Sequence, residues 1–90
     1  MRNANIVINT KPGLHLRIAG RVCEHARRSQ SKIIVRKGSR VADGRSIIEL
    51  LMLDAPEGSE LEISAEGDDE DVVIAEITRI FFDNEDEQES

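Results

Sequence analysis

The sequence has few of the residues on which several classes of protein depend. It contains one cysteine, no tryptophan, no tyrosine and two adjacent phenylalanines, Phe81 and Phe82. A single cysteine, Cys23, cannot close a disulfide within the chain, which agrees with a reducing compartment. We interpret it as a small buried hydrophobic residue on a helix. Because aromatic residues are so scarce, the stacking platforms of single-stranded nucleic-acid binders are almost absent.

Long hydrophobic runs are also missing. The longest, such as Leu50 to Leu53, are far shorter than the roughly 20 residues that span a bilayer, and residues 1–5 lack the apolar core of a signal peptide. We therefore expect no membrane insertion and a cytoplasmic location. The two histidines and one cysteine lack the paired spacing of a zinc site, and the acidic run 68–71 lacks the features of a calcium loop. No metal and no cofactor are predicted.

Charge is divided unevenly along the ninety residues, whose net charge is −6. Residues 1–45 hold eleven of the twelve lysines and arginines, and residues 46–90 hold sixteen of the eighteen acids. This asymmetry predicts a basic face that meets an acidic partner or a phosphate. The arginines within residues 17–28 could suggest nucleic-acid binding, but the acidic second half argues against it. Steep salt-dependent affinity for DNA or RNA would be needed to support that alternative.

The hydrophobic periodicity predicts alternating strands and helices in one small domain. Strands are predicted over four β-rich or alternating segments, residues 5–9, 32–37, 40–43 and 60–66. Helices are predicted where apolar residues recur every three to four positions, over residues 16–28, 47–53 and from the acidic start at 68–71 through Phe81. The order β-α-β-β-α-β-α predicts an α+β open-faced sandwich, a four-stranded, mostly antiparallel sheet with helices on one face. We expect the domain to cover residues 1–83 and a frayed acidic tail to cover 84–90.

His15 lies between the turn signal Lys11-Pro12-Gly13 and the first predicted helix. At or next to a helix N-cap, an imidazole is close to free backbone N–H groups and to the positive end of the helix dipole. The guanidinium of Arg17 can reach the same space, and its planar fork matches phosphate oxygens. This combination is suited to nucleophilic capture of a phosphoryl group without a metal. The alternative is that His15 is only a helix cap or an exposed residue.

Ser46 stands just before the second predicted helix, and Glu49 follows three residues later in a capping-box pattern. As an N-cap, Ser46 would satisfy a free backbone N–H. As a phosphoacceptor, it would place about two negative charges at the helix start. The two roles are compatible. His25, inside the first helix, we interpret as a half-buried structural residue and not as a second acceptor.

The segment from Gly13 to Ala19, GLHLRIA, resembles the phosphorylation signature of HPr, the histidine-containing phosphocarrier family of the bacterial phosphoenolpyruvate-dependent sugar phosphotransferase system. The resemblance runs from about residue 3 to residue 82, and it includes Ser46-Ile47-Ile48 and the segment 58–67. It implies the HPr-like open-faced sandwich, with three helices on one face of the sheet. It also implies that His15 and Ser46 lie on neighbouring helix ends.

The resemblance implies that His15 accepts a phosphoryl group from phosphoenolpyruvate through enzyme I and passes it to sugar-specific acceptor proteins. Arg17 would stabilise the phosphohistidine, and Ser46 would be the residue that HPr kinase modifies in some relatives. The protein would then be a monomeric, stoichiometric carrier and not a turnover enzyme. Partner docking is expected at five residues: Leu16, Arg21, Ile47, Ile48 and Leu51.

Three positions depart from the family pattern. The family usually has proline where this chain has Ile18, a small residue at Leu16 and often glycine at Glu49. We expect the loss of proline to loosen the site slightly, the bulkier Leu16 to narrow partner choice, and Glu49 to add negative charge near Ser46. The alternative function is a regulatory module of the same fold, controlled at Ser46 or His15. Such a module would bind a kinase or a transcription regulator without feeding sugar transport.

Overall fold

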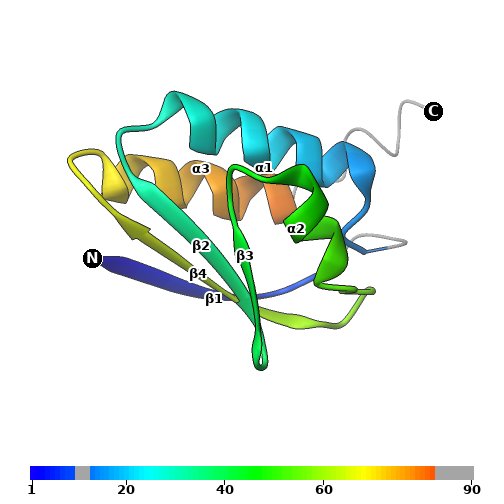
Figure 1. Cartoon of the computed structure of the whole chain (residues 1–90). Helices are drawn as coiled ribbons and strands as arrows, with labels where there is room; N and C mark the ends of the chain where they lie inside the picture. The colour runs from blue at the N-terminus through cyan, green and yellow to red at the C-terminus, as the bar shows by residue number, and fades with distance from the viewer. Residues whose placement is uncertain (10–12, 83–90) are drawn as a thin grey trace.

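The computed structural model describes residues 1–9 and 13–82, and over these residues it shows one sheet with helices packed on one side (Figure 1). The strands are β1 (Arg2–Val7), β2 (Lys32–Lys37), β3 (Arg40–Asp43) and β4 (Glu60–Glu66). The helices are α1 (Leu16–Arg28), α2 (Ile47–Met52) and α3 (Glu70–Phe82). This order is the predicted one. The tail predicted over 84–90 lies outside the described residues.

The sheet has the strand order β1-β4-β2-β3, and each neighbouring pair is antiparallel. Side chains alternate between the two faces of a strand, so one face of the sheet is apolar and packs against the helices. The other face is open and carries mainly polar residues; in one row across β1, β4 and β2, Asn5, Glu62 and Arg36 lie side by side. The predicted α+β open-faced sandwich is confirmed.

The first strand differs from its prediction, which covered residues 5–9. It begins at Arg2 because its register follows β4: Arg2 lies opposite Ala65, and Val7 lies opposite Glu60. The asparagines of β1 have low β-propensity, but pairing with the long neighbouring strand overrides that local preference. Ile8 lies just beyond the strand, where its N–H donates to the Ser59 carbonyl at 2.9 Å.

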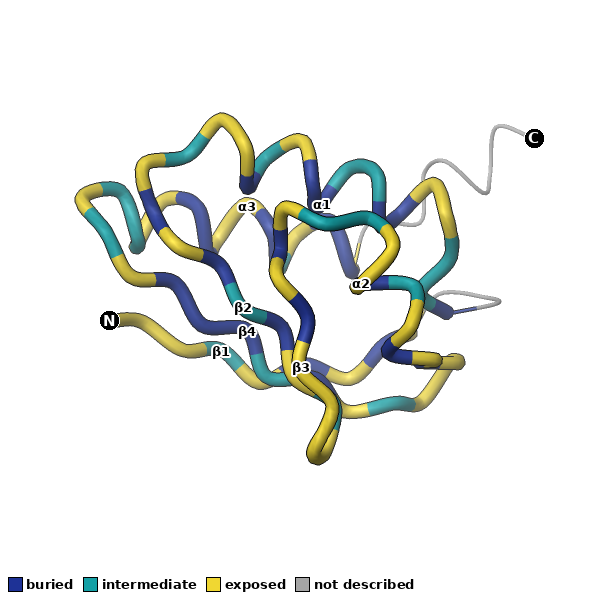
Figure 2. Tube along the Cα trace, in the orientation of Figure 1, coloured by how far each residue is buried: buried dark blue, intermediate teal, exposed yellow. Residues whose placement is uncertain are grey.

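The core lies between the sheet and the helices, where the buried positions of both layers face each other (Figure 2). As predicted, α1 buries a single stripe consisting of Ile18, Ala19, Val22, Cys23 and Ala26. The stripe of α3 contains Val73, Ile74, Ile77, Ile80 and Phe81. Full burial of one large apolar side chain contributes roughly 1.5–3 kcal/mol, so α1 is firmly seated and its first turn has a fixed position. Among the described residues, none of the helices has the length and apolar character needed to cross a bilayer.

Candidate functional site

The segment leading into α1 is anchored to the loop that follows α2. Leu14 N–H donates to the Ala55 carbonyl at 2.8 Å. The preceding residue, Gly13, has φ +107°, and an added Cβ there would lie 2.5 Å from the Ala55 oxygen and 2.6 Å from Pro56 Cα. Only glycine tolerates both this backbone conformation and this close approach. The start of α1 is therefore held beside the end of α2.

His15 is the N-cap of α1, in an extended conformation with φ −124° and ψ 179°. Its carbonyl accepts the first helical hydrogen bond, from Ala19 N–H at 2.8 Å, while its side chain forms no capping bond. The half-buried imidazole has no hydrogen-bond partner among the described residues. Within the described ranges, both ring nitrogens are thus left for a nucleophilic role.

The first turn of α1 concentrates positive potential beside this imidazole. The backbone N–H groups of Leu16, Arg17 and Ile18 precede the first helical bond and have no acceptor within the described part of the chain. The first turn also contains no acid, although acidic residues normally stabilise that position. An arginine stands there instead, which is unfavourable for the helix alone but favourable for a bound anion.

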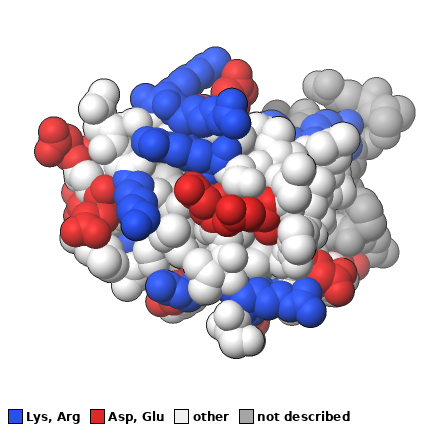
Figure 3. All heavy atoms as spheres, viewed as in Figure 1, with Lys and Arg blue, Asp and Glu red and all other residues white. Residues whose placement is uncertain are grey.

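Arg17 differs from most other cations of the protein, because its guanidinium has no partner among residues 1–9 and 13–82. Figure 3 shows basic side chains gathered along α1 and along the β2–β3 hairpin, with acidic side chains between them. Several of these cations are already engaged: Arg28 with Glu24 at 2.8 Å, Arg36 with Glu62 at 3.6 Å, Arg2 with Asp71 at 2.7 Å, and Lys37 with the Asp54 carbonyl at 2.6 Å. Arg17 thus differs from these cations, because the described residues give its guanidinium no partner.

Ser46 is the N-cap of α2, and its Oγ accepts a hydrogen bond from Glu49 N–H at 3.2 Å. The predicted capping box forms only in part. The Glu49 carboxylate accepts from Asp43 N–H at 2.9 Å and not from Ser46 N–H, because that group donates to the Asp43 carbonyl at 3.0 Å. The Ser46 cap is confirmed. The Glu49 carboxylate, however, binds the N–H of Asp43, three residues before the N-cap, in place of the N–H of Ser46.

His15 and Ser46 begin helices that pack together, but the two residues are not adjacent. The carbonyl of Arg45, just before Ser46, accepts from Cys23 Sγ at 3.1 Å and from the Arg27 guanidinium at 3.3 Å. Cys23 is eight residues beyond His15, a distance of about 12 Å along a helix. The expectation of neighbouring helix ends is therefore wrong in this respect: the end of α2, and not its start, lies by the histidine.

The five predicted docking residues divide into exposed and half-buried groups. Leu16 and Ile48 are 65% and 71% exposed, whereas Ile47 and Leu51 are half-buried against the core and Arg21 is half-buried on α1. Sequence reasoning missed Met52, which is 69% exposed. It stands four residues after Ile48 and so shares its helix face, a spacing that could have revealed it. We call Ile48 and Met52 the apolar patch; Leu16 is exposed separately, at the start of α1.

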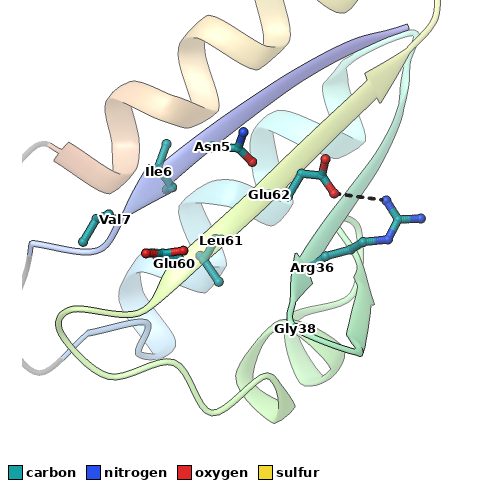
Figure 4. Close-up of a pocket in the computed structure, with 8 residues that line it drawn as sticks. All are labelled: Asn5, Ile6, Val7, Arg36, Gly38, Glu60, Leu61 and Glu62. Atoms are coloured by element: carbon teal, nitrogen blue, oxygen red, sulfur yellow. Dashed lines mark ion pairs between the residues drawn. The ribbon is translucent and has the colours of Figure 1, made fainter.

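Three other sequence interpretations can be placed in the structure. Cys23 is buried, as predicted. His25 is half-buried, with its Nδ1 3.0 Å from the Arg21 carbonyl, which agrees with a structural role. No group of three metal-ligating side chains occurs in the part of the chain that the structure describes. A hollow of about 500 Å³ lies on the open face of the sheet (Figure 4), around Asn5, Glu62 and Arg36, on the side away from the helices and hence away from His15.

Within the described residues, an imidazole and a guanidinium without partners stand at one helix N-terminus of an open-faced sandwich, an arrangement suited to a phosphoryl-carrying class of protein. A family sequence model described as "PTS HPr component phosphorylation site" matches residues 3–83. The chain therefore belongs to the HPr family of phosphocarrier proteins of the phosphotransferase system. Members of this family carry phosphoryl groups and are not themselves catalysts.

Individual relatives agree with this assignment. Phosphocarrier protein NPr of Klebsiella oxytoca is 32% identical over 77 residues, which cover 84% of this chain and 86% of the relative. The multiphosphoryl transfer protein of Rhodobacter capsulatus is 45% identical over 51 residues, 57% of this chain but only 6% of that much longer protein. The crystal structure of HPr-C-His from Thermoanaerobacter tengcongensis has a TM-score of 0.85 and 32% identity, covering 90% of this chain and 91% of the other.

Proposed function

We propose that His15 accepts a phosphoryl group that originates from phosphoenolpyruvate, is delivered by enzyme I, and is then passed to an acceptor protein. The observation that supports this most is that an imidazole and a guanidinium, both without partners in the described part of the chain, stand two residues apart at the start of α1. Neither group has a structural task among the described residues, and together they provide a nucleophile and a counter-charge. The relay places the protein in the cytoplasm, where phosphoenolpyruvate is found.

In the proposed transfer, a ring nitrogen of His15 uses its lone pair to attack phosphorus. A nitrogen–phosphorus bond forms, and the bond between phosphorus and the leaving group of the donor breaks, so that its electron pair departs with that group. The added negative charge would be countered by Arg17 and by the N–H groups of residues 16–18. Transfer to the acceptor reverses these steps at the next nucleophile.

The identity of the acceptor is a separate part of the proposal. The similar proteins include an HPr structure, an NPr protein and a multiphosphoryl transfer protein, so a phosphotransferase relay is their common feature. Sugar-specific acceptors are the first candidates to test. Leu16, which follows His15 in the chain, is 65% exposed. Its side chain would contact each of these partners and restrict which of them bind.

A regulatory module is the second candidate function, and the position of Ser46 favours it. Its hydroxyl lies at the start of α2, on the helix that carries the exposed Ile48. A phosphate there would lie at the start of α2, where the Arg45 carbonyl contacts Cys23 and not His15, and would act by repelling an acidic partner from the shared surface. HPr kinase and a transcription regulator would be the partners of such a module.

The two candidates differ in the fate of the phosphoryl group. The test incubates the protein with radiolabelled phosphoenolpyruvate and enzyme I from the same genome, and then adds the candidate acceptor proteins of that genome. A carrier passes its label on, and His15→Ala takes up none. Label that stays on the protein in the presence of every acceptor would support the regulatory module. Incubation with HPr kinase and ATP then tests Ser46; an unmodified serine would count against that regulatory role.

A further inference from the structure

A groove between β3 and α2 lies next to the apolar patch. It has a volume of about 460 Å³ and is lined by Arg40, Val41, Glu49, Met52 and Leu53. Helix α2 packs against α1 on one side and against β3 on the other. Because Met52 belongs both to the patch and to the groove, a partner that covers the patch also reaches the groove.

The walls of the groove are apolar and open. Val41 is 54% exposed on the β3 side, and Met52 is exposed on the α2 side. The cation at the edge of the groove is already committed, because the Arg40 guanidinium donates to the Met52 carbonyl at 3.3 Å and to the Leu53 carbonyl at 3.5 Å. These bonds satisfy carbonyls at the end of α2 and hold the Arg40 guanidinium at that helix end, and within the described residues it forms no ion pair with Glu49.

Glu49 supplies the negative charge of the groove. Its exposed carboxylate is oriented by Asp43 N–H at 2.9 Å, and no cation pairs with it in the described ranges of the chain. The Asp43 carboxylate lies in the same turn and accepts from Arg45 N–H at 2.9 Å. Acidic side chains accordingly lie at the centre of this face, between the two basic groups (Figure 3). A carboxylate with two oxygens has acceptor capacity left after one backbone bond.

We propose that this groove receives a lysine or arginine side chain of a partner protein, and that Glu49 thereby selects among the proteins that exchange a phosphoryl group with His15. The aliphatic stem of such a side chain matches Val41 and Met52, and its charged end matches the Glu49 carboxylate. The inference rests on the proposed function, because the partner reaches the groove by docking over the apolar patch. A partner face that is acidic throughout is disfavoured by Glu49.

The test measures how tightly the full chain binds enzyme I from the same genome, by titration calorimetry at low and high salt. Glu49→Gln keeps an oxygen for Asp43 N–H but removes the charge, and Glu49→Lys reverses the charge. The matched control is Glu76→Gln, an exposed acid on α3. We expect Glu49→Gln to weaken binding about three- to tenfold and Glu49→Lys to weaken it by more than tenfold, both less at high salt, with the control unchanged.

A second measurement, phosphorylation by a small donor, separates this inference from the proposed function. Each variant is treated with phosphoramidate, a small phosphoryl donor that needs no docking surface, and His15 phosphorylation should be equal in all of them. Unchanged or tighter binding of enzyme I by both Glu49 variants would overturn the inference and leave the proposed function standing. If the unmutated chain neither binds enzyme I nor takes label from it, the proposed function fails, and this inference fails with it.

Discussion

At the scale of single residues, we expect the reactivity of His15 to depend on the Arg17 guanidinium, which has no partner among the described residues. Arg17→Gln should slow phosphorylation of His15 by enzyme I about ten- to a hundredfold, because the transferred charge loses its fork of donors. Rapid-quench measurement with labelled phosphoenolpyruvate gives the rate. Arg79→Gln is the matched control, since Arg79 is also exposed and has no partner in the described residues. An equal rate in both variants would remove Arg17 from the site.

Two glycines near the site should respond in opposite ways to the same added methyl group. Gly13→Ala forces a Cβ to 2.5 Å from the Ala55 oxygen at a positive φ, whereas a Cβ at Gly20, on α1, meets nothing within 4 Å. We expect the first change to lower the free energy of unfolding by about 2–3 kcal/mol. The second should raise it by about 0.5–1 kcal/mol through helix propensity. Urea unfolding measures both, and similar effects at the two positions would contradict the close packing of Gly13.

At the scale of elements, α2 is a helix that its own six residues cannot sustain. It is held by the buried Leu50, by the Ser46 cap and by the bonds from Cys23 and Arg27 to the Arg45 carbonyl. Its position relative to α1 therefore depends on contacts from a distant part of the chain. This is why the apolar patch has a defined geometry.

The cap of α2 can be tested with a pair of substitutions. Ser46→Ala removes the acceptor for Glu49 N–H and should lower the free energy of unfolding by about 1 kcal/mol. Ser46→Asp keeps an acceptor and places negative charge at the helix start, so its stability should stay within about 0.5 kcal/mol of the unmutated protein. Chemical denaturation followed by circular dichroism distinguishes the two. A loss as large in the aspartate variant as in the alanine variant would show that capping is not the role of Ser46.

The sequence predicts most of these elements because their signals are local. The apolar residues of the α1 stripe lie within a few residues of one another, and the structure buries them as expected. In β4, Leu61, Ile63 and Ala65 are buried as the alternation predicts, but Ser64, which alternates with them, is buried as well. The predicted start of β1, at residue 5, was wrong because the true start, at Arg2, is set by pairing with β4. The prediction that His15 and Ser46 lie on neighbouring helix ends was wrong because their positions depend on how α2 packs against α1. Neither long-range contact has a signal in a single sequence.

The candidate site likewise has a part that local sequence signals predict and a part that depends on long-range contacts. His15 and Arg17 are adjacent in the chain, so their common position at a helix start could be read from the turn and the apolar spacing. The groove that contains Glu49 joins two elements and is visible only once they are packed. That Arg17 has no partner among the described residues, while Arg36 and Arg40 are engaged, also requires the structure, because composition counts every cation alike.

At the scale of the whole molecule, acid should unfold the protein partly through one junction between α3 and the start of β2. The hydrogen bond from the Ser31 hydroxyl to Asp69, at 2.6 Å, and then the bond from Gln30 N–H, at 2.9 Å, lower the pKa of Asp69 from its ordinary value of 3.8. A lowered folded pKa contributes stability above the ordinary value, and this stability is lost as the pH falls through the folded value.

Asp69→Asn should therefore make the free energy of unfolding less dependent on pH below about 4. Urea titrations from neutral pH to below the ordinary carboxyl value measure that dependence. Glu76→Gln, at an exposed position on α3, should leave the loss of stability in acid unchanged. If the stability of Asp69→Asn falls as steeply in acid as that of the unmutated protein, the junction has no part in acid unfolding.

The central claim, that His15 carries the phosphoryl group, is tested most directly by intact-mass measurement. The full chain is incubated with phosphoenolpyruvate and an active enzyme I from the same genome, beside His15→Ala. We predict a single phosphoryl adduct on the unmutated protein that disappears in acid, as a phosphohistidine does, and no adduct on the variant. An adduct that survives acid, or one that persists in His15→Ala, would contradict the account.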